Sequence, residues 1–311
     1  MNTAELFNFK KTHKLFGLKK DFDFLKSLHN LNKFPRSLLI SGKKGEGKST
    51  MINHLMYYIF DRENYDSQDN IFSDKTAFHK LFSKNLHENI IYLSSFDIKN
   101  IKIDDIRYLK DRILKTTINK KNRYIILDDI DLFNLSSLNA LLKLIEEPKS
   151  NNHFILINNN AKYLIDTIKS RCIEIKIKIK NTDLNRINND VLNFYNQKEI
   201  LNLDILNVSP GNFLKFNYLL EENDINIKND YLLNLKILIN LYKKNKDPLF
   251  IELITFFTDY YIACFRDKNI HHYKNLIQKR QFILNKLNEF FLYNLSMNTL
   301  LNSLENHYLN D

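Results

Sequence analysis

Cysteine is scarce in this chain, and its scarcity limits the possible chemistry. The 311 residues include two cysteines, Cys172 and Cys264. Two cysteines cannot form a disulfide framework, and by themselves they cannot supply the four ligands of a structural zinc site. No histidine or asparagine stands out in the sequence as a partner for Cys172. We therefore interpret Cys172 as a small buried hydrophobic residue and not as a nucleophile.

Long apolar runs are also missing. No stretch approaches the roughly 20 apolar residues that a membrane-spanning helix needs. The N-terminal sequence, MNTAELFNFKKTHKLFGL, lacks the apolar block and the small-residue cleavage site of a secretory signal. From these absences we expect no membrane association and a cytoplasmic location.

The net charge is +10, and lysine carries most of the positive side because the chain has only nine arginines. Such a surplus can serve nucleic-acid binding, since Lys and Arg release counterions when they meet phosphates. The lysines are, however, spread along the whole chain and are interleaved with abundant Asn and Ile. We interpret the charge as a solvated surface set by composition bias, not as a dedicated DNA-binding patch.

The first part of the chain alternates short apolar runs with longer segments of helical spacing. The helical segments include residues 51–60, 103–116 and 136–146. This alternation predicts an α/β domain with a mostly parallel five-stranded sheet covered on both faces. The last apolar run alternates Ile with Lys or Glu, which is typical of an edge strand. The five expected strands are residues 37–41, 89–93, 124–127, 154–157 and 173–179.

The strand pattern stops after about residue 180. Residues 181–193 and 213–222 have helical spacing, with a break at Ser209-Pro210-Gly211 between them. From about residue 225 onward the chain is rich in Leu, Ile and Phe with helical periodicity. We therefore expect a small helical domain and then a larger helical bundle.

Glycine is also rare, and most of it is gathered in one short segment. Three of the five glycines fall within eight residues, G-K-K-G-E-G-K-S at 42–49, which fit the phosphate-loop pattern G-x-x-x-x-G-K-[ST]. Glycine lets backbone N–H groups turn toward a phosphate without a Cβ in the way. A strand precedes the loop and a helix follows it, as the pattern requires. The predicted nucleotide-binding residues are Gly42, Gly45, Gly47, Lys48, Ser49 and Thr50.

The loop predicts ATP with Mg²⁺ as the ligand. Lys48 would reach the β- and γ-phosphates, and the Ser49 hydroxyl would ligate the magnesium ion. A second part of such a site follows the apolar strand RYIILDDID. Asp128 at the strand end is the expected holder of Mg²⁺, and Asp129 could act as general base toward the attacking water. Asp131 fits the role of a structural cap better.

Residues 138–175 carry several spaced motifs. They contain N-A-L-L-K at 139–143, E-E-P at 146–148 and T-I-K-S-R-C at 167–172. This combination closely resembles the AAA+ clamp-loader ATPases of the bacterial replicative polymerase, DNA polymerase III. The resemblance covers residues 15–179 and, in outline, the helical remainder. It implies an AAA+ P-loop domain over residues 1–180, a helical lid domain over 181–222 and a C-terminal helical collar domain over 223–311.

The resemblance also implies roles for residues outside the phosphate loop. Asn158 or Asn159 matches the sensor near the γ-phosphate, where an amide can orient the attacking water. Arg171 matches the arginine finger, which in this family projects into the ATP site of a neighbouring subunit and stabilises charge on the transferred phosphoryl group. The implied partners are the motor and clamp-opening subunits of the loader, the sliding clamp, and primer–template DNA through the complex.

Three departures favour the delta-prime group of this family. Residues 50–120 contain no cysteine, so the four-cysteine zinc module of many members has no place there. The acidic strand ends Asp128-Asp129 where the motor subunits usually have Asp-Glu, and a shorter carboxylate lies farther from a water. The segment Ser209-Pro210-Gly211-Asn212 lacks the arginine that motor subunits use to contact the γ-phosphate. We therefore expect ATP binding, with hydrolysis by this chain itself left open.

Two alternatives remain. The chain could be a gamma/tau-like motor subunit that turns over ATP with Lys48, Asp128 and Asp129, which strong hydrolysis by the purified chain would support. It could also be another AAA+ ATPase of DNA repair or helicase loading, which predicts DNA-stimulated hydrolysis without partner subunits. The motifs at 139–148 and 170–172 argue against the second alternative.

Overall fold

The structure is a computed structural model that describes residues 9–94, 101–114, 121–148, 151–202, 204–266 and 273–308. The chain forms two compact units. The first, here called the α/β unit, comprises residues 1–191 and Ser209–Asn212, and the second, the helical unit, comprises Leu192–Val208 and Phe213–Asp311. The three-domain division expected from the sequence stays a prediction.

The α/β unit is built on the five-stranded parallel sheet that the sequence predicts. Its order is β4-β5-β6-β1-β7, so the first strand in the chain lies between the last two. The side chains of Leu38 and Ile155 in its centre are fully buried, because parallel strands are covered on both faces. The strands are β1 (Ser37–Ser41), β4 (Ile90–Ser94), β5 (Arg123–Asp128), β6 (Asn152–Asn158) and β7 (Ile173–Lys176).

Strand β7 lies at the edge of the sheet, as its alternating sequence predicts. It pairs in parallel with β1, and Ile173 on it is 62% exposed. Strand β4 forms the opposite edge. The expected fold class is therefore confirmed at the level of strand number, direction and edge position.

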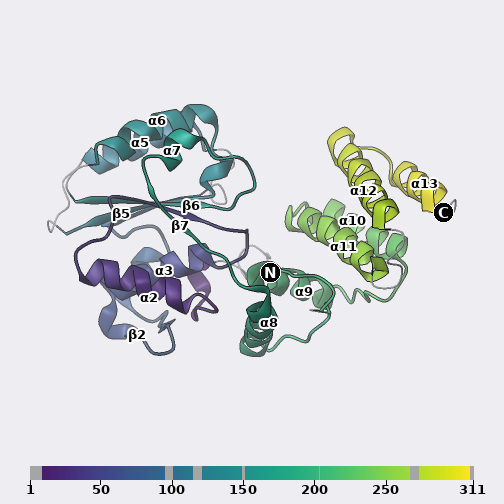
Figure 1. The fold of residues 1–311 in the computed structure, drawn as a ribbon, viewed down its shortest axis with the longest axis horizontal. Helices are drawn as coiled ribbons and strands as arrows, with labels where there is room; N and C mark the ends of the chain where they lie inside the picture. Colours follow the sequence, from purple (N-terminus) through teal and green to yellow (C-terminus); the bar gives the residue numbers. More distant parts are fainter. Residues whose placement is uncertain are drawn as a thin grey trace. The chain divides into compact units, whose positions relative to one another are not determined.

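Helices cover both faces of the sheet (Figure 1). On one face lie α5 (Ile103–Leu114), α6 (Leu135–Glu146) and the short α7 (Asp166–Lys169). The short helix η3 (Ile130–Leu132) comes between α5 and α6 in the chain. The other face carries α2 (Lys19–Asn30) and α3 (Lys48–Phe60). Helix α3 is buried almost all round from Met51 to Tyr58, so it is a core helix and not an amphipathic surface helix.

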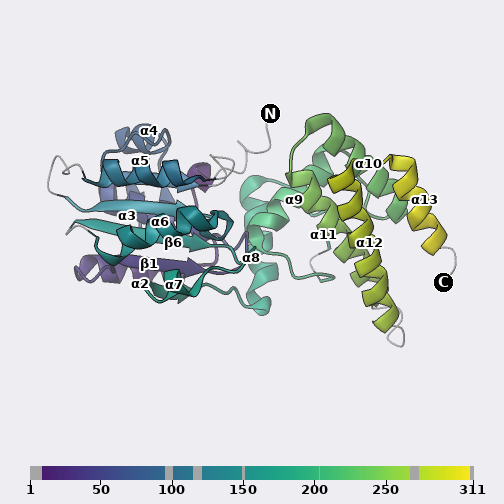
Figure 2. The ribbon, with the colours of Figure 1, turned by 90° about the horizontal axis from the view of Figure 1, so that it is seen from above.

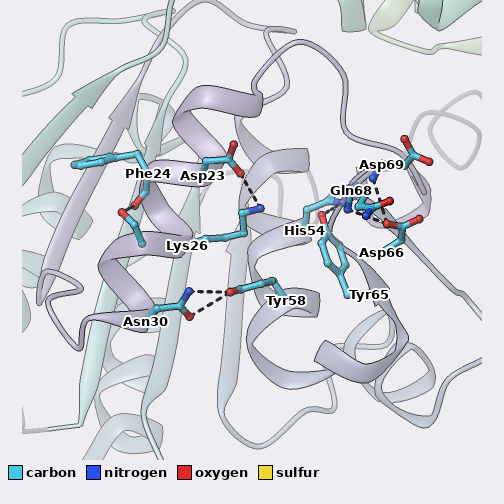
Figure 3. Close-up of polar contacts among 11 residues, drawn as sticks. Asp23, Phe24, Lys26, Asn30, His54, Tyr58, Tyr65, Asp66, Gln68 and Asp69 are labelled. Atoms are coloured by element: carbon cyan, nitrogen blue, oxygen red, sulfur yellow. Dashed lines mark hydrogen bonds and ion pairs between the residues drawn. The ribbon is translucent and has the colours of Figure 1, made fainter.

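A small aromatic hairpin packs against α3, and the sequence did not predict it. It comprises β2 (Tyr65–Asp66) and β3 (Ile71–Phe72), between η2 (Arg62–Asn64) and α4 (Ala77–Phe82). The Phe72 ring stacks on Tyr57 of α3 with ring centroids 3.8 Å apart. His54 of α3 is fully buried beside the hairpin and bonds the Tyr65 hydroxyl at 3.0 Å (Figure 3). A further short helix, η1 (Phe9–Lys11), precedes α2.

The helical unit consists of the later helices packed around one apolar core. Its long elements are α10 (Tyr231–Asn245), α11 (Leu249–Arg266), α12 (Tyr273–Tyr293) and α13 (Met297–Tyr308), and Figure 2 shows α12 alongside α11. Arg280 of α12 forms a two-bond ion pair with Asp259 of α11. Helices α8 (Asn181–Tyr195) and α9 (Pro210–Glu222) have residues in both units. Within the described residues, no helix combines the length and the apolar character needed to cross a membrane.

Candidate nucleotide-binding site

The carboxyl ends of three neighbouring strands bring the predicted site residues to one edge of the sheet. Ser41 at the end of β1 is paired with Asn158 at the end of β6, and β5 lies on the other side of β6. The N–H of Gly42 donates to the Asn158 carbonyl at 3.2 Å, which fixes the start of the phosphate loop to β6. In open α/β sheets ligands bind at this edge, outside the carboxyl ends of the strands.

The loop itself has a backbone that requires glycine. Gly45 and Gly47 have φ of +84° and +89°, a region that residues with a Cβ rarely adopt. Gly47 is also the N-cap of α3, and its carbonyl accepts the N–H of Met51 at 2.8 Å. Ser49 and Thr50 follow in the first turn of that helix. The N-terminus of α3 therefore opens directly from the loop, an arrangement that favours anions.

Lys48 lies inside the loop. Its side chain is 2% exposed, and Nζ donates to the carbonyls of Gly42 at 2.8 Å and Lys43 at 2.7 Å. Burial lowers the pKa of Lys48 to about 8. Four carboxylates oppose this shift by stabilising the charged ammonium: Glu46, Asp128, Asp131 and Asp129. A buried ammonium that gains only partial compensation from its surroundings is well suited to an anionic ligand.

Asp128 lies at the end of β5 and is buried. It accepts hydrogen bonds from the Tyr92 hydroxyl, from the Ser49 side chain, and from the N–H of Asp129 at 2.9 Å. Burial raises the pKa of Asp128 to about 6, the charge of Asp129 adds to the rise, and the three hydrogen bonds oppose it. The structure thus places the two predicted magnesium-holding residues, Ser49 and Asp128, in direct contact.

Tyr92 is a site residue that the sequence analysis missed. It lies in β4, the neighbour of β5, and its hydroxyl donates to Oδ2 of Asp128. A single tyrosine in an apolar strand carries no functional signal of its own. Its importance follows from the strand order, which places β4 beside β5.

The two asparagines that were candidates for the sensor have different hydrogen-bond partners. Asn159 Nδ2 donates to Oδ1 of Asp129 at 2.5 Å, so the predicted sensor and the predicted general base are in contact. The Asn158 side chain is engaged locally: its Oδ1 accepts the N–H of Asn160 at 2.9 Å, and its Nδ2 donates to Ser41 Oγ at 3.4 Å. Of the two, Asn159 is the one in contact with the predicted general base, and the sensor role of either stays a prediction.

Asp129 and Asp131 have different surroundings despite their closeness in the chain. Asp129 has φ of +54°, a left-handed backbone that turns the chain out of β5. Asp131 is buried, and its carboxylate accepts the N–H groups of Asn159 at 3.1 Å and Ala161 at 2.7 Å. These contacts are those of a structural cap for the loop after β6, as expected for Asp131.

A segment distant in the sequence contacts the outer side of the phosphate loop. The Ser209 hydroxyl donates to the Lys44 carbonyl at 2.7 Å, and the N–H of Gly211 donates to the Gly45 carbonyl at 2.8 Å. The resemblance implies that this Ser-Pro-Gly-Asn segment stands where motor subunits have an arginine that contacts the γ-phosphate, but it does not predict these two hydrogen bonds to the loop. Its contact with the loop is long-range and has no local sequence signal.

Arg171 lies apart from these residues, after α7. Its hydrogen bonds run to Glu146 at the end of α6, to the Thr167 carbonyl at 2.9 Å and to Ser170. Among the residues described, none of its bonding partners belongs to the phosphate loop. The side chain is 36% exposed. The neighbouring Cys172 is partly buried, and burial raises the pKa of its thiol to about 12, which does not favour a nucleophilic thiolate.

Comparison with known proteins gives the family context. The family model described as "DNA polymerase III, delta subunit" matches residues 17–181, more than half of the chain. The DNA polymerase III subunit delta' of Buchnera aphidicola subsp. Schizaphis graminum is 28% identical over 243 residues, which are 73% of this chain and 71% of that protein. The subunit delta' of Buchnera aphidicola subsp. Baizongia pistaciae is 27% identical over 47% of this chain and 44% of its own length.

Gamma subunits are also similar to this chain. DNA polymerase III subunit gamma of Buchnera aphidicola subsp. Schizaphis graminum is 25% identical over 58% of this chain and 47% of its own length. Among solved structures, a DNA polymerase III gamma subunit-related protein from Thermotoga maritima has a TM-score of 0.47 and 17% identity, and the match covers 90% of this chain and 96% of that protein.

Proposed function

The chain belongs to the family of DNA polymerase III delta subunits, and on this basis we propose that it is a delta-prime-like subunit of a sliding-clamp loader. In this role it binds ATP with Mg²⁺ and offers Arg171 to the ATP site of a neighbouring subunit while the clamp is loaded onto primer–template DNA. The observation that carries the nucleotide-binding part is the enclosure of Lys48 within a glycine-shaped loop beside the Ser49–Asp128 contact.

The residues at the sheet edge fit the chemistry of a magnesium nucleotide. Positive φ at Gly45 and Gly47 lets the loop curve around phosphates without a Cβ in the way. Lys48 would hold the phosphate oxygens, and it would exchange its bonds to two loop carbonyls for a stronger charged partner. Ser49 and Asp128 would hold the magnesium ion, which supplies charge neutralisation at the phosphates when it is bound.

Hydrolysis by this chain alone does not follow from nucleotide binding. Asp129 is the carboxylate available to polarise a water, and Asn159 already bonds it at 2.5 Å. The shorter Asp side chain in place of Glu leaves a larger gap to an attacking water. We therefore infer that the main contribution of this chain to ATP turnover is made in trans by Arg171. Exposure of that side chain and its place outside the phosphate loop support this role.

The proposed partners follow from this role. They are the motor and clamp-opening subunits of the loader, the sliding clamp, and DNA contacted through the complex, all in the cytoplasm. The apolar core shared by α10 to α13 is consistent with a stable helical collar domain for assembly with sister subunits.

The test is the clamp- and DNA-stimulated ATPase of a loader reconstituted from this chain, its motor subunit and its clamp-opening partner. We expect Arg171→Ala to lower turnover by about 10³-fold or more, the size associated with an arginine finger supplied in trans. Lys48→Ala should have little effect on the same turnover. Arg171→Ala should leave the stability of the isolated chain nearly unchanged, because its ion pair with Glu146 is solvent-exposed.

The opposite pattern would identify a motor subunit. If Lys48→Ala abolishes turnover and Arg171→Ala has no effect, the chain is itself a gamma/tau-like ATPase, a reading that the similarity to gamma subunits keeps open. DNA-stimulated hydrolysis by the purified chain without partners would instead indicate an ATPase of DNA repair or helicase loading.

A further inference from the structure

The Ser209–Asn212 segment holds two consecutive carbonyls of the phosphate loop. The Ser209 hydroxyl donates a hydrogen bond to the Lys44 carbonyl at 2.7 Å, and the N–H of Gly211 donates one to the Gly45 carbonyl at 2.8 Å. The two partners are about 165 residues apart in the chain, yet both belong to the α/β unit. The contact therefore forms part of the unit that carries the loop.

These two bonds also determine where the loop N–H groups point. In a trans peptide the C=O and the following N–H are coplanar and point in opposite directions. Holding the Lys44 and Gly45 carbonyls on the side of Ser209 and Gly211 therefore directs the N–H groups of Gly45 and Glu46 to the opposite side. The N–H of Glu46 makes only a long bond of 3.4 Å to the Lys43 carbonyl, which a phosphate oxygen can replace.

The close approach depends on two glycines that face each other. A Cβ added to Gly211 would lie 3.0 Å from the Gly45 carbonyl oxygen and 3.2 Å from its Cα. A Cβ added to Gly45 would lie 2.4 Å from Ser209 Oγ and 2.8 Å from Asn212 Oδ1. A side chain at position 211 would therefore press on the backbone of Gly45, and one at position 45 would displace the side chains of Ser209 and Asn212 and strain a backbone with φ of +84°.

We propose that the Ser209–Asn212 segment is a positioning element of the nucleotide site, in which Ser209 and Gly211 fix the peptide orientations of the phosphate loop before the nucleotide arrives. The inference rests on the proposed function, because it concerns the affinity of that same loop for a nucleotide. A loop held in its binding shape loses less conformational freedom when the ligand binds, so the affinity is higher. Ser209 and Gly211 act through the loop and do not themselves touch the ligand.

The test measures binding of MgADP to the full chain by calorimetry, with Ser209→Ala and Gly211→Ala as the variants. Loss of the Ser209 hydroxyl should weaken MgADP binding about three- to tenfold, the effect of one hydrogen bond. Gly211→Ala should weaken it at least as much, because its Cβ presses on Gly45. Ser209→Thr keeps the hydroxyl and should restore most of the affinity. The matched control is Ser303→Ala, which removes a hydroxyl–carbonyl bond of the same 2.7 Å length far along the chain.

A second measurement reports how strongly the backbone of the phosphate loop is held, and it needs no ligand. Amide hydrogen exchange of the peptide covering residues 43–47 should be faster in Ser209→Ala than in the unmodified chain or in Ser303→Ala. The thermal midpoint should stay close to that of the unmodified chain, which separates positioning from a general loss of stability. Unchanged MgADP affinity in both Ser209→Ala and Gly211→Ala would overturn the inference, whatever the exchange rates.

The failure of this inference is distinguishable from that of the proposed function. If MgADP binds the unmodified chain and Lys48→Ala abolishes binding while Ser209→Ala and Gly211→Ala bind normally, the nucleotide site stands and the positioning role is wrong. If the unmodified chain does not bind MgADP at all, nucleotide binding fails and the positioning role fails with it.

Discussion

At the scale of single residues, Asp128 has three hydrogen-bond donors before any ligand is bound. Two of them, Ser49 and the N–H of Asp129, belong to residues that the sequence predicts for the site, and the third, Tyr92, does not. Each of these bonds stabilises the ionised carboxylate against the burial that raises the pKa of Asp128 to about 6. Tyr92 therefore helps keep Asp128 charged, the form in which a carboxylate holds a magnesium ion.

Replacing Tyr92 by Phe tests this role. Loss of the hydroxyl should raise the pKa of Asp128 further, so fewer molecules carry the ionised carboxylate near neutral pH. We expect the affinity for MgADP, relative to the unmodified chain, to fall about threefold or more at pH 6 and to recover toward pH 8. Taking the ratio at each pH removes the contribution of Lys48, whose pKa of about 8 is common to both proteins.

Tyr108→Phe is the matched control for Tyr92→Phe, because the Tyr108 side chain is 67% exposed on α5. Its MgADP affinity should follow the unmodified chain at both pH values. A Tyr92→Phe ratio that is the same at pH 6 and pH 8 would show that the hydroxyl does not act through the charge of Asp128.

The site residues that could be predicted are those with a short-range pattern. Gly45, Gly47, Lys48 and Ser49 follow from one eight-residue motif, and Asp128 follows from its place at the end of an apolar strand. Tyr92 contacts these residues from a neighbouring strand, and nothing in its local sequence indicates it. The resemblance points to the Ser209–Asn212 segment, but the bond from Ser209 to the Lys44 carbonyl has no local sequence signal. Such contacts depend on strand order and chain packing, which one sequence read by periodicity does not supply.

At the scale of elements, predictability followed length and burial. Four strands of the parallel sheet were found because each is a continuous apolar run between helices, and β7 was found through its alternation of Ile with Lys or Glu. Strands β2 and β3 were missed, since each has two residues and neither can show a period. The hairpin is held by side chains instead, through the Tyr57–Phe72 stack and the bond between His54 and Tyr65 (Figure 3).

In the helical unit, a buried amide side chain holds a loop in place. Asn217 of α9 is fully buried, and its Oδ1 accepts the N–H groups of Ile200 at 2.8 Å and Leu201 at 3.3 Å. Its Nδ2 donates to the Lys198 carbonyl at 2.5 Å. One side chain thus satisfies three backbone groups of the loop that precedes α9, which an apolar replacement would leave without these partners.

Asn217→Ala should therefore destabilise the protein by about 2–3 kcal/mol, measured by urea unfolding with helical circular dichroism. Asn223→Ala is the control in the same helix region, because Asn223 makes one bond, to the Leu219 carbonyl, and is only partly buried. Its cost should stay below about 1 kcal/mol. Equal costs for the two variants would mean that the loop finds other partners when Asn217 is removed.

At the scale of the whole molecule, the histidines whose pKa is lowered lie in the α/β unit among the residues that the structure describes. Five histidines in this unit have a pKa lowered by burial: His29, His54, His79, His87 and His153. A histidine that is neutral in the folded protein and protonated in the unfolded chain makes acid unfold the protein. The candidate nucleotide site belongs to the same unit, so we expect protonation of these side chains to affect its integrity as well.

His54 makes the largest single contribution to this effect that the structure indicates. Burial lowers its pKa from the usual 6.5 to about 4, and its ring nitrogens bond the Tyr65 hydroxyl and the Thr12 carbonyl, each at 3.0 Å. Between pH 6.5 and about 4 the unfolded chain binds the proton and the folded chain does not. The part of the unfolding free energy that depends on neutral His54 is therefore fully present above pH 6.5 and is lost as the pH falls to about 4. It amounts to about 3 kcal/mol.

His54→Gln isolates this contribution, because glutamine can offer a donor and an acceptor but does not titrate. We expect the free energy of unfolding of the full chain, measured with urea from pH 7 to pH 4.5, to fall less steeply in His54→Gln than in the unmodified protein, even if the variant is less stable at pH 7. Asp128, whose raised pKa works in the opposite direction over pH 3.8 to about 6, is present in both proteins and cancels in the comparison. Tyr65→Phe is the control, because it keeps the histidine and should retain the steep fall of unfolding free energy with pH. If His54→Gln shows the same steep fall as the unmodified chain, the acid sensitivity belongs to the other four histidines.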